Sequence, residues 1–181
     1  MYPKRSLVTL QQFFSGVTEQ TFETRFGIAD PPLVDYVADM LTRFVRCDAL
    51  HGVRGPSGRR LEGVVDMLAE ANERMGTARR ELHRHIGDFT LFWSGVYPEA
   101  LVRLQAADRK DYLVDYPTLG KWSYRLASTL SDGPEQDEKN RLLERLSQEY
   151  ELCVQALGEI RREWEQRDPS AGNPPTGLWV E

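Results

Sequence analysis

The sequence predicts an all-α fold: a single-domain helical bundle of four or five main helices with two short N-terminal helices. Apolar residues recur every three or four positions along most of the 181-residue chain, as they do on one face of a helix. No stretch shows the strict alternation of apolar and polar residues that is typical of a half-buried strand. A bundle is the arrangement that places each apolar stripe against another.

Two short helices are expected first. The spacing of apolar residues predicts one helix over residues 7–14, and Gly16 is expected to end it. A second short helix is expected over residues 19–26, with Gly27 as its stop signal.

A third helix is expected to begin after Asp30. This residue is a good N-cap, and Pro31 after it suits the first position of a helix. Apolar residues at helical spacing continue the helix to about Asp48. Residues 51–60 contain three glycines and a proline, so they are expected to form a loop.

The longest helix is expected from Arg59 to Val96, with the others packed around it. Its apolar stripe consists of Leu61, Val64, Leu68, Ala71, Met75, Ala78 and Leu82. Gly87 weakens a helix by about 1 kcal/mol relative to Ala, and Asp88 after it is a good N-cap. We therefore expect a kink or a short break at residues 86–88, followed by a second helical segment that ends near Val96.

Three further segments complete the predicted bundle. Pro98 is expected to open a short helix over residues 98–104. Residues 111–116 are ambiguous between a helical turn and a short strand, and a helix is expected over residues 117–130. The last predicted helix follows Pro134 and continues through Trp164 with a clean apolar stripe.

The predicted domain organisation is one helical domain over residues 1–168 and a Pro/Gly-rich C-terminal tail over residues 169–181. The tail contains the apolar residues Leu178, Trp179 and Val180. We expect these residues either to dock onto their own domain or a neighbouring subunit, or to remain disordered.

Charge and hydropathy exclude several classes of protein. A net charge of −5 gives no overall attraction to nucleic acid or to an anionic membrane. The longest apolar run, residues 89–97, is far shorter than the roughly 20 residues needed to cross a bilayer. Thr9, Gln11 and Gln12 interrupt the apolar core that a signal peptide would need. We therefore expect a cytoplasmic protein that binds neither nucleic acid nor a membrane.

A candidate metal site is formed by Glu81, His85 and Asp88. Their i, i+4 and i+7 spacing places two carboxylates and an imidazole on one helical face, and these groups bind zinc, iron or manganese. However, neither His83 nor His85 follows a glutamate by three residues, as in the motif of di-metal bundles. The alternative is that His85 lies at the edge of the core, Asp88 caps a helix and His83 faces water. We expect no resident cofactor.

A candidate ligand pocket is suggested by tyrosines and acidic residues that follow His85 and Asp88. If the turn at residues 95–99 lies over the next long helix, these polar side chains would converge beside His85, as in a binding pocket. The set comprises Tyr97, Glu99, Tyr112, Asp115, Tyr116 and Tyr124. The alternative is that each tyrosine buries its ring and places its hydroxyl at the surface.

One motif resembles a known group of proteins. It is the segment Gly87-Asp88-Phe89-Thr90-Leu91-Phe92-Trp93-Ser94-Gly95, followed downstream by Tyr116, Gly120 and Tyr124. This pattern is similar to that of a family of bacterial all-helical proteins with no established activity. The resemblance implies a bacterial origin and an all-helical fold over residues 32–164, and implies nothing about chemistry.

The favoured interpretation of function is a non-enzymatic helical protein that acts through self-association or a protein partner. It is based on the surplus of aromatic residues and on the apolar tail. The alternative is a protein that binds a small ligand or a metal, or an enzyme, with its site around His85 and Asp88.

Overall fold

The computed structural model describes residues 7–46, 53–106, 109–130 and 133–173. In these ranges the regular structure is helical, apart from one isolated bridge between Arg54 and Arg60, so the all-α prediction is confirmed. The α-helices are α1 (Leu7–Phe26), α2 (Pro31–Val45), α3 (Val64–Glu73), α4 (Gly76–Val96), α5 (Pro98–Leu104), α6 (Tyr116–Thr129), α7 (Asp137–Gln148) and α8 (Tyr150–Arg167). Three 3-10 turns accompany them, η1 (Lys110–Leu113), η2 (Pro134–Gln136) and η3 (Pro169–Gly172).

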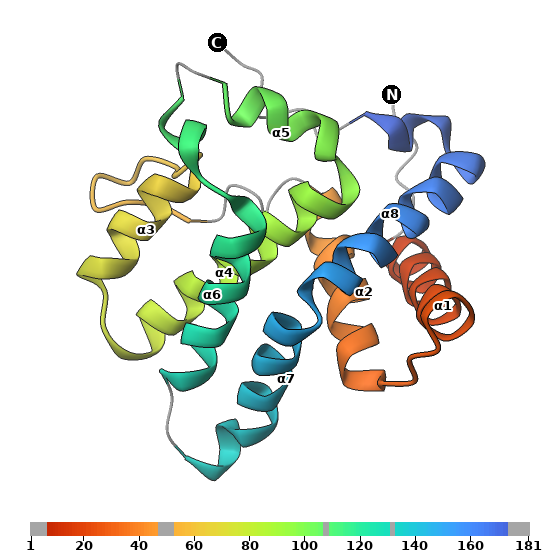
Figure 1. The fold of residues 1–181 in the computed structure, drawn as a ribbon, viewed down its shortest axis with the longest axis horizontal. Helices are drawn as coiled ribbons and strands as arrows, with labels where there is room; N and C mark the ends of the chain where they lie inside the picture. Colours follow the sequence, from red (N-terminus) through yellow and green to blue (C-terminus); the bar gives the residue numbers. More distant parts are fainter. Residues whose placement is uncertain (1–6, 47–52, 107–108, 131–132, 174–181) are drawn as a thin grey trace.

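Helix α4 passes through the middle of the bundle (Figure 1). It packs most extensively against α6 and also contacts α3, α8, α5 and α2. Helices α1 and α2 form a pair at one side, and α8 contacts both α1 and α4. Along α4, an unbroken buried run from Ile86 to Trp93 forms the centre of the core.

The two short N-terminal helices expected from the sequence are one helix, α1. Gly16 lies inside it, although glycine costs about 1 kcal/mol at such a position. Phe14 and Phe22 are fully buried on either side of Gly16, and the Phe14 ring meets Trp164 of α8 at 5.2 Å between centroids. This packing outweighs the local penalty. The expected stop at Gly27 is present, with a positive φ of 65°.

The predicted break in the central helix lies elsewhere. The chain is interrupted at Arg74 and Met75, whose backbones are extended, and α4 restarts at Gly76 with a φ of +56°. Gly87 and Asp88 lie within α4, so the expectation of a kink and a cap there was wrong. A Cβ at Gly87 would lie 2.6 Å from the Tyr124 ring of α6. The glycine therefore allows two helices to approach closely and does not end one.

The predicted last helix is divided into α7 and α8 at Glu149. The junction is a bend, because the Glu149 amide still donates to Arg145 and its carbonyl still accepts from the Cys153 amide. The ambiguous segment at residues 111–116 contains the end of η1 and the first residue of α6, with no strand.

Part of the predicted tail lies against the bundle. Residues 169–172 form η3, which contacts α8, and Ala171 is buried. Leu178, Trp179 and Val180 lie outside the described residues. Among the helices described, none combines the length and the apolar character that a membrane span requires.

Candidate functional site

A buried carboxylate, Asp88, lies at the centre of the bundle. Its side chain is 1% exposed. One oxygen, Oδ1, accepts hydrogen bonds from the hydroxyls of Tyr36 at 2.6 Å and Tyr124 at 2.7 Å. The other, Oδ2, accepts from the guanidinium groups of Arg43 at 3.3 Å and Arg84 at 3.4 Å. These four donors match the roughly four lone-pair sites that a carboxylate offers.

This Asp88 cluster joins three helices. Tyr36 and Arg43 are seven residues apart and lie on one face of α2, Arg84 and Asp88 are four apart on α4, and Tyr124 comes from α6. A buried charge is stable only when it is paired and hydrogen-bonded, and here both arginines supply positive charge. Burial, reinforced by the nearby Asp88 charge, raises the pKa of Tyr36 and of Tyr124 well above the ordinary value. Both hydroxyls therefore stay protonated as donors.

Tyr36 also reaches the surface of the bundle. Its side chain helps to line a hollow of about 400 Å³ between α1, α2 and α7. The other lining residues are Gln11, Ser15, Asp35, Asp39 and Leu142. One tyrosine thus connects this hollow with the buried Asp88.

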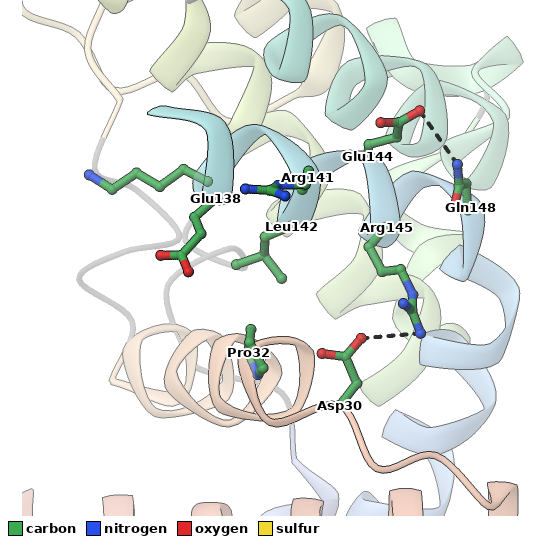
Figure 2. Close-up of a pocket in the computed structure, with 9 residues that line it drawn as sticks. Asp30, Pro32, Glu138, Arg141, Leu142, Glu144, Arg145 and Gln148 are labelled. Atoms are coloured by element: carbon green, nitrogen blue, oxygen red, sulfur yellow. Dashed lines mark hydrogen bonds and ion pairs between the residues drawn. The ribbon is translucent and has the colours of Figure 1, made fainter. Parts of the chain in front are cut away.

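A larger hollow of about 560 Å³ adjoins it between the N-terminal end of α2 and α7 (Figure 2). Leu142 points from α7 toward α2, where Pro32 lies opposite, and Arg145 pairs with Asp30 across the hollow at 3.1 Å. The lining residues are Asp30, Pro32, Glu138, Lys139, Arg141, Leu142, Glu144, Arg145 and Gln148. Leu142 lines both hollows, and the two together are here called the α2–α7 groove.

The groove exists because α2 and α7 bury their apolar faces elsewhere. Helix α7 packs mainly against α6 and buries Leu143 and Leu146, whereas α2 packs mainly against α1. The two helices themselves make few contacts with each other. An apolar floor at Leu142 and Pro32 with charged residues of both signs around it is an arrangement suited to binding.

The predicted metal residues do not form a metal site in the structure. Glu81 pairs with Arg80 at 3.2 Å and with Arg84 at 2.9 Å, and Arg84 also bonds Asp88. A guanidinium therefore bridges the two carboxylates that were expected to share a cation. His85 stacks on Phe44 with 5.8 Å between ring centroids. Within the described part of the chain, no three His, Cys, Asp or Glu side chains are grouped closely enough to hold a metal ion.

The predicted tyrosine pocket is divided among three places. Tyr124 bonds Asp88, but the Tyr97 hydroxyl donates to the Ala171 carbonyl at 2.9 Å. Tyr116 donates to Asp111 at 2.7 Å. Of the two acids, Glu99 pairs with Arg161 at 2.6 Å, whereas Asp115 caps α6 by accepting from the Thr118 amide at 3.0 Å. Of the proposed ligand-binding residues, the structure brings Asp88 and Tyr124 into direct contact.

His83 is buried, which corrects the expectation that it faces water. Its ring meets Trp122 of α6 edge-on at 5.3 Å, and neither ring nitrogen has a hydrogen-bond partner among the described residues. Burial lowers the pKa of His83 to about 4, and the charge of Arg79 acts in the same direction.

Sequence reasoning missed a second buried carboxylate, Asp111. It accepts the backbone amides of Val64 at 2.9 Å and Val65 at 3.0 Å, together with the Tyr116 hydroxyl. It therefore accepts hydrogen bonds from backbone amides in the first turn of α3 that have no partner within the helix, although it lies 46 and 47 residues away in the sequence. No local pattern could have revealed this. Tyr36 and Arg43 were missed as well, although their seven-residue spacing is a signal that places them on one face of α2.

The chain matches no protein-family model, no curated protein and no solved structure. The resemblance to a family of bacterial helical proteins therefore stays a prediction.

Proposed function

We propose that this chain is a non-enzymatic helical protein that acts by binding a protein partner or a second copy of itself through the α2–α7 groove. The observation that carries the proposal is the groove itself. The apolar side chain of Leu142 lines both of its hollows, which have volumes of about 560 and 400 Å³. Such a floor within a charged rim resembles the anatomy of protein interfaces, which have an apolar centre and a polar edge.

The rim charges supply a basis for specificity. Acidic residues line the α2 side, namely Asp30, Asp35 and Asp39, and the α7 side carries Lys139, Arg141 and Arg145 together with Glu138 and Glu144. A partner segment that presents an apolar side chain between charges of both signs would complement both walls. Complementary charges raise the association rate and exclude wrong partners more than they add affinity.

A small ligand is the second candidate, because about 560 Å³ falls within the range of roughly 300–1,000 Å³ typical of ligand pockets. A ligand or metal at His85 and Asp88 has weaker support. Each Asp88 oxygen already accepts two hydrogen bonds from protein donors, so a ligand would have to displace them.

The test is Leu142→Asp, which places a charge on the floor of the groove. Met75→Asp is the matched control, because Met75 is 86% exposed and lies on the α3–α4 connection, outside the groove residues. Sedimentation velocity over a wide concentration range measures self-association, and native mass spectrometry detects a retained small molecule.

The proposal expects association, with itself or with a captured partner, that Leu142→Asp abolishes and Met75→Asp preserves. A protein that stays monomeric at every concentration and whose captured partners are unaffected by Leu142→Asp would refute it. A small molecule that the wild-type chain retains and Leu142→Asp loses would instead favour the second candidate.

The proposed setting is the cytoplasm, with no nucleic acid as partner. The net charge of −5 supports the second point, since nucleic acid binding depends on clustered positive charge.

A further inference from the structure

A group of apolar side chains is exposed where α5 and η1 meet. Val102 is 76% exposed, Tyr112 54% and Leu113 87%. Gln105 follows Val102 by three residues, so it lies on the same side of α5, and its amide donates to the Val114 carbonyl beside Leu113. This hydrogen bond joins the end of α5 to the residue after η1, and the three exposed side chains of these two elements are here called the α5–η1 patch.

The last described residues of the chain lie close to the start of α5. The Arg161 guanidinium contacts Glu99 in the first turn of α5 at 2.6 Å and the Gly172 carbonyl at 3.4 Å. One side chain therefore ties the start of α5 to the last described residues. The buried Ala171, whose carbonyl accepts the Tyr97 hydroxyl, holds these residues in place.

The following residues are long enough to reach the patch. Val102 lies three residues after Glu99, which is less than one helical turn and about 5 Å along the axis of α5. The five residues from Pro174 to Leu178 span up to about 17 Å when extended. Tail residues beyond Gly172 can therefore reach Val102 and, past it, Leu113.

The tail also has the chemistry to cover the patch. Leu178, Trp179 and Val180 are apolar, and Glu181 after them is acidic. The patch is apolar at its centre and bears basic residues in and around η1, including the exposed Arg109 and Lys110. Exposing the apolar side chains of the tail and of the patch to water is unfavourable, and contact between them would bury both surfaces at once.

We propose that Leu178, Trp179 and Val180 dock onto the α5–η1 patch of their own chain. This surface is separate from the α2–α7 groove, so the inference goes beyond the proposed function and does not depend on it.

Disulfide trapping tests the contact directly. The test variant combines Leu113→Cys with Trp179→Cys, and the control combines Met75→Cys with Trp179→Cys, both in a Cys47→Ser background in which the buried Cys153 is retained. Leu113 and Met75 are almost equally exposed, at 87% and 86%. However, the 21 residues of α4 place Met75 about 30 Å from Val96, whose carbonyl accepts a hydrogen bond from the same Arg161 guanidinium that contacts Gly172. That distance exceeds the roughly 20 Å that residues 174–179 can span.

The expected result is a disulfide within one chain that forms several-fold more readily in the Leu113 pair than in the Met75 pair. Equal trapping in both pairs would overturn the proposal. A disulfide that joins two chains would also overturn it, because the tail would then bind a second copy.

Fluorescence gives a second measurement that needs no cysteine. Subtracting the spectrum of Trp179→Phe from that of the full chain isolates the emission of Trp179. Docking predicts blue-shifted emission that acrylamide quenches poorly, and Leu113→Asp is expected to shift it to the red and raise quenching several-fold. Emission typical of a water-exposed indole in the unmodified chain would refute docking. Leu113 is almost fully exposed, so circular dichroism is expected to show an unchanged fold in the variant.

Discussion

Replacing Asp88 with asparagine tests whether the Asp88 cluster holds α2, α4 and α6 together. The amide keeps the shape of the side chain and an oxygen for the hydroxyls of Tyr36 and Tyr124. It removes the negative charge and turns an NH₂ group toward Arg43 and Arg84, so donors then face donors.

The magnitude follows from the four contacts. Each tyrosine bond weakens from a charged to a neutral acceptor, which costs about 0.5–1 kcal/mol. The side chains of Arg43 and Arg84 are 33% and 28% exposed, so water replaces part of the interaction that they lose with the carboxylate. The loss of the two arginine contacts therefore costs about 1–2 kcal/mol in total. We expect Asp88→Asn to lower the free energy of unfolding by about 2–4 kcal/mol, and Asp88→Ala by about 3–5 kcal/mol.

Urea unfolding followed by circular dichroism measures the change. The variant should still fold at 25 °C, because domains of this kind are stable by about 5–15 kcal/mol. Asp35→Asn is the matched control, since Asp35 is exposed on the same helix as Tyr36, and it should change stability by no more than about 0.5 kcal/mol. A loss below about 1 kcal/mol for Asp88→Asn, or an equal loss in the control, would refute the reasoning.

Three other predictions concern stability. Gly87→Ala should lower the free energy of unfolding, measured in urea, by about 1–3 kcal/mol, because the added Cβ would lie 2.6 Å from the Tyr124 ring. Gly16→Ala should instead raise it by up to about 1 kcal/mol, because no atom lies within 4 Å of the added Cβ and alanine favours the helix. The pKa of His83 is lowered to about 4 in the folded chain, whereas in the unfolded chain it has its ordinary value of about 6.5. Between these pH values only the unfolded chain binds the proton, so the free energy of unfolding should fall by up to about 3 kcal/mol as the pH drops from about 6.5 to 4. His83→Gln should flatten this pH dependence when unfolding is measured across the same range. Asp111→Asn should lower the free energy of unfolding by about 2–3 kcal/mol, because it weakens the hydrogen bonds to the first turn of α3. The expected signature is a lower urea midpoint with an unchanged dependence of the free energy on urea concentration.

Features that depend on neighbouring residues were predictable. The N-cap and proline at Asp30 and Pro31 begin α2, Pro98 begins α5, and Gly27 ends α1 as expected. These signals act within one helical turn, where side-chain caps and backbone conformations are decided by residues close in sequence.

Glycines that the sequence suggested as helix breaks were misinterpreted where tertiary packing opposes the local preference. Gly16 and Gly87 have the local properties of helix breakers, yet both lie inside helices. At Gly16 the burial of flanking aromatic residues outweighs about 1 kcal/mol of propensity, and at Gly87 the missing side chain makes room for Tyr124. The interruption at Gly76 uses the same residue type in a left-handed conformation.

The candidate site illustrates the same limit. Asp88 and Tyr124 were both proposed as site residues, but the sequence offered no reason to join them to Tyr36 and Arg43. The hydrogen bonds to Asp88 span 52, 45 and 36 residues. The α2–α7 groove was likewise hidden, because it arises where two helices turn their apolar faces toward other partners.

The sequence by itself determined that this protein is helical and where several of its helices begin, because hydrophobic periodicity and capping are properties of short segments. The tertiary structure alone decided which glycines interrupt a helix, where each buried carboxylate finds its donors and which surface is left hollow. Those outcomes depend on groups that come together only when distant segments pack, since a buried charge must be paired wherever the chain brings its partners.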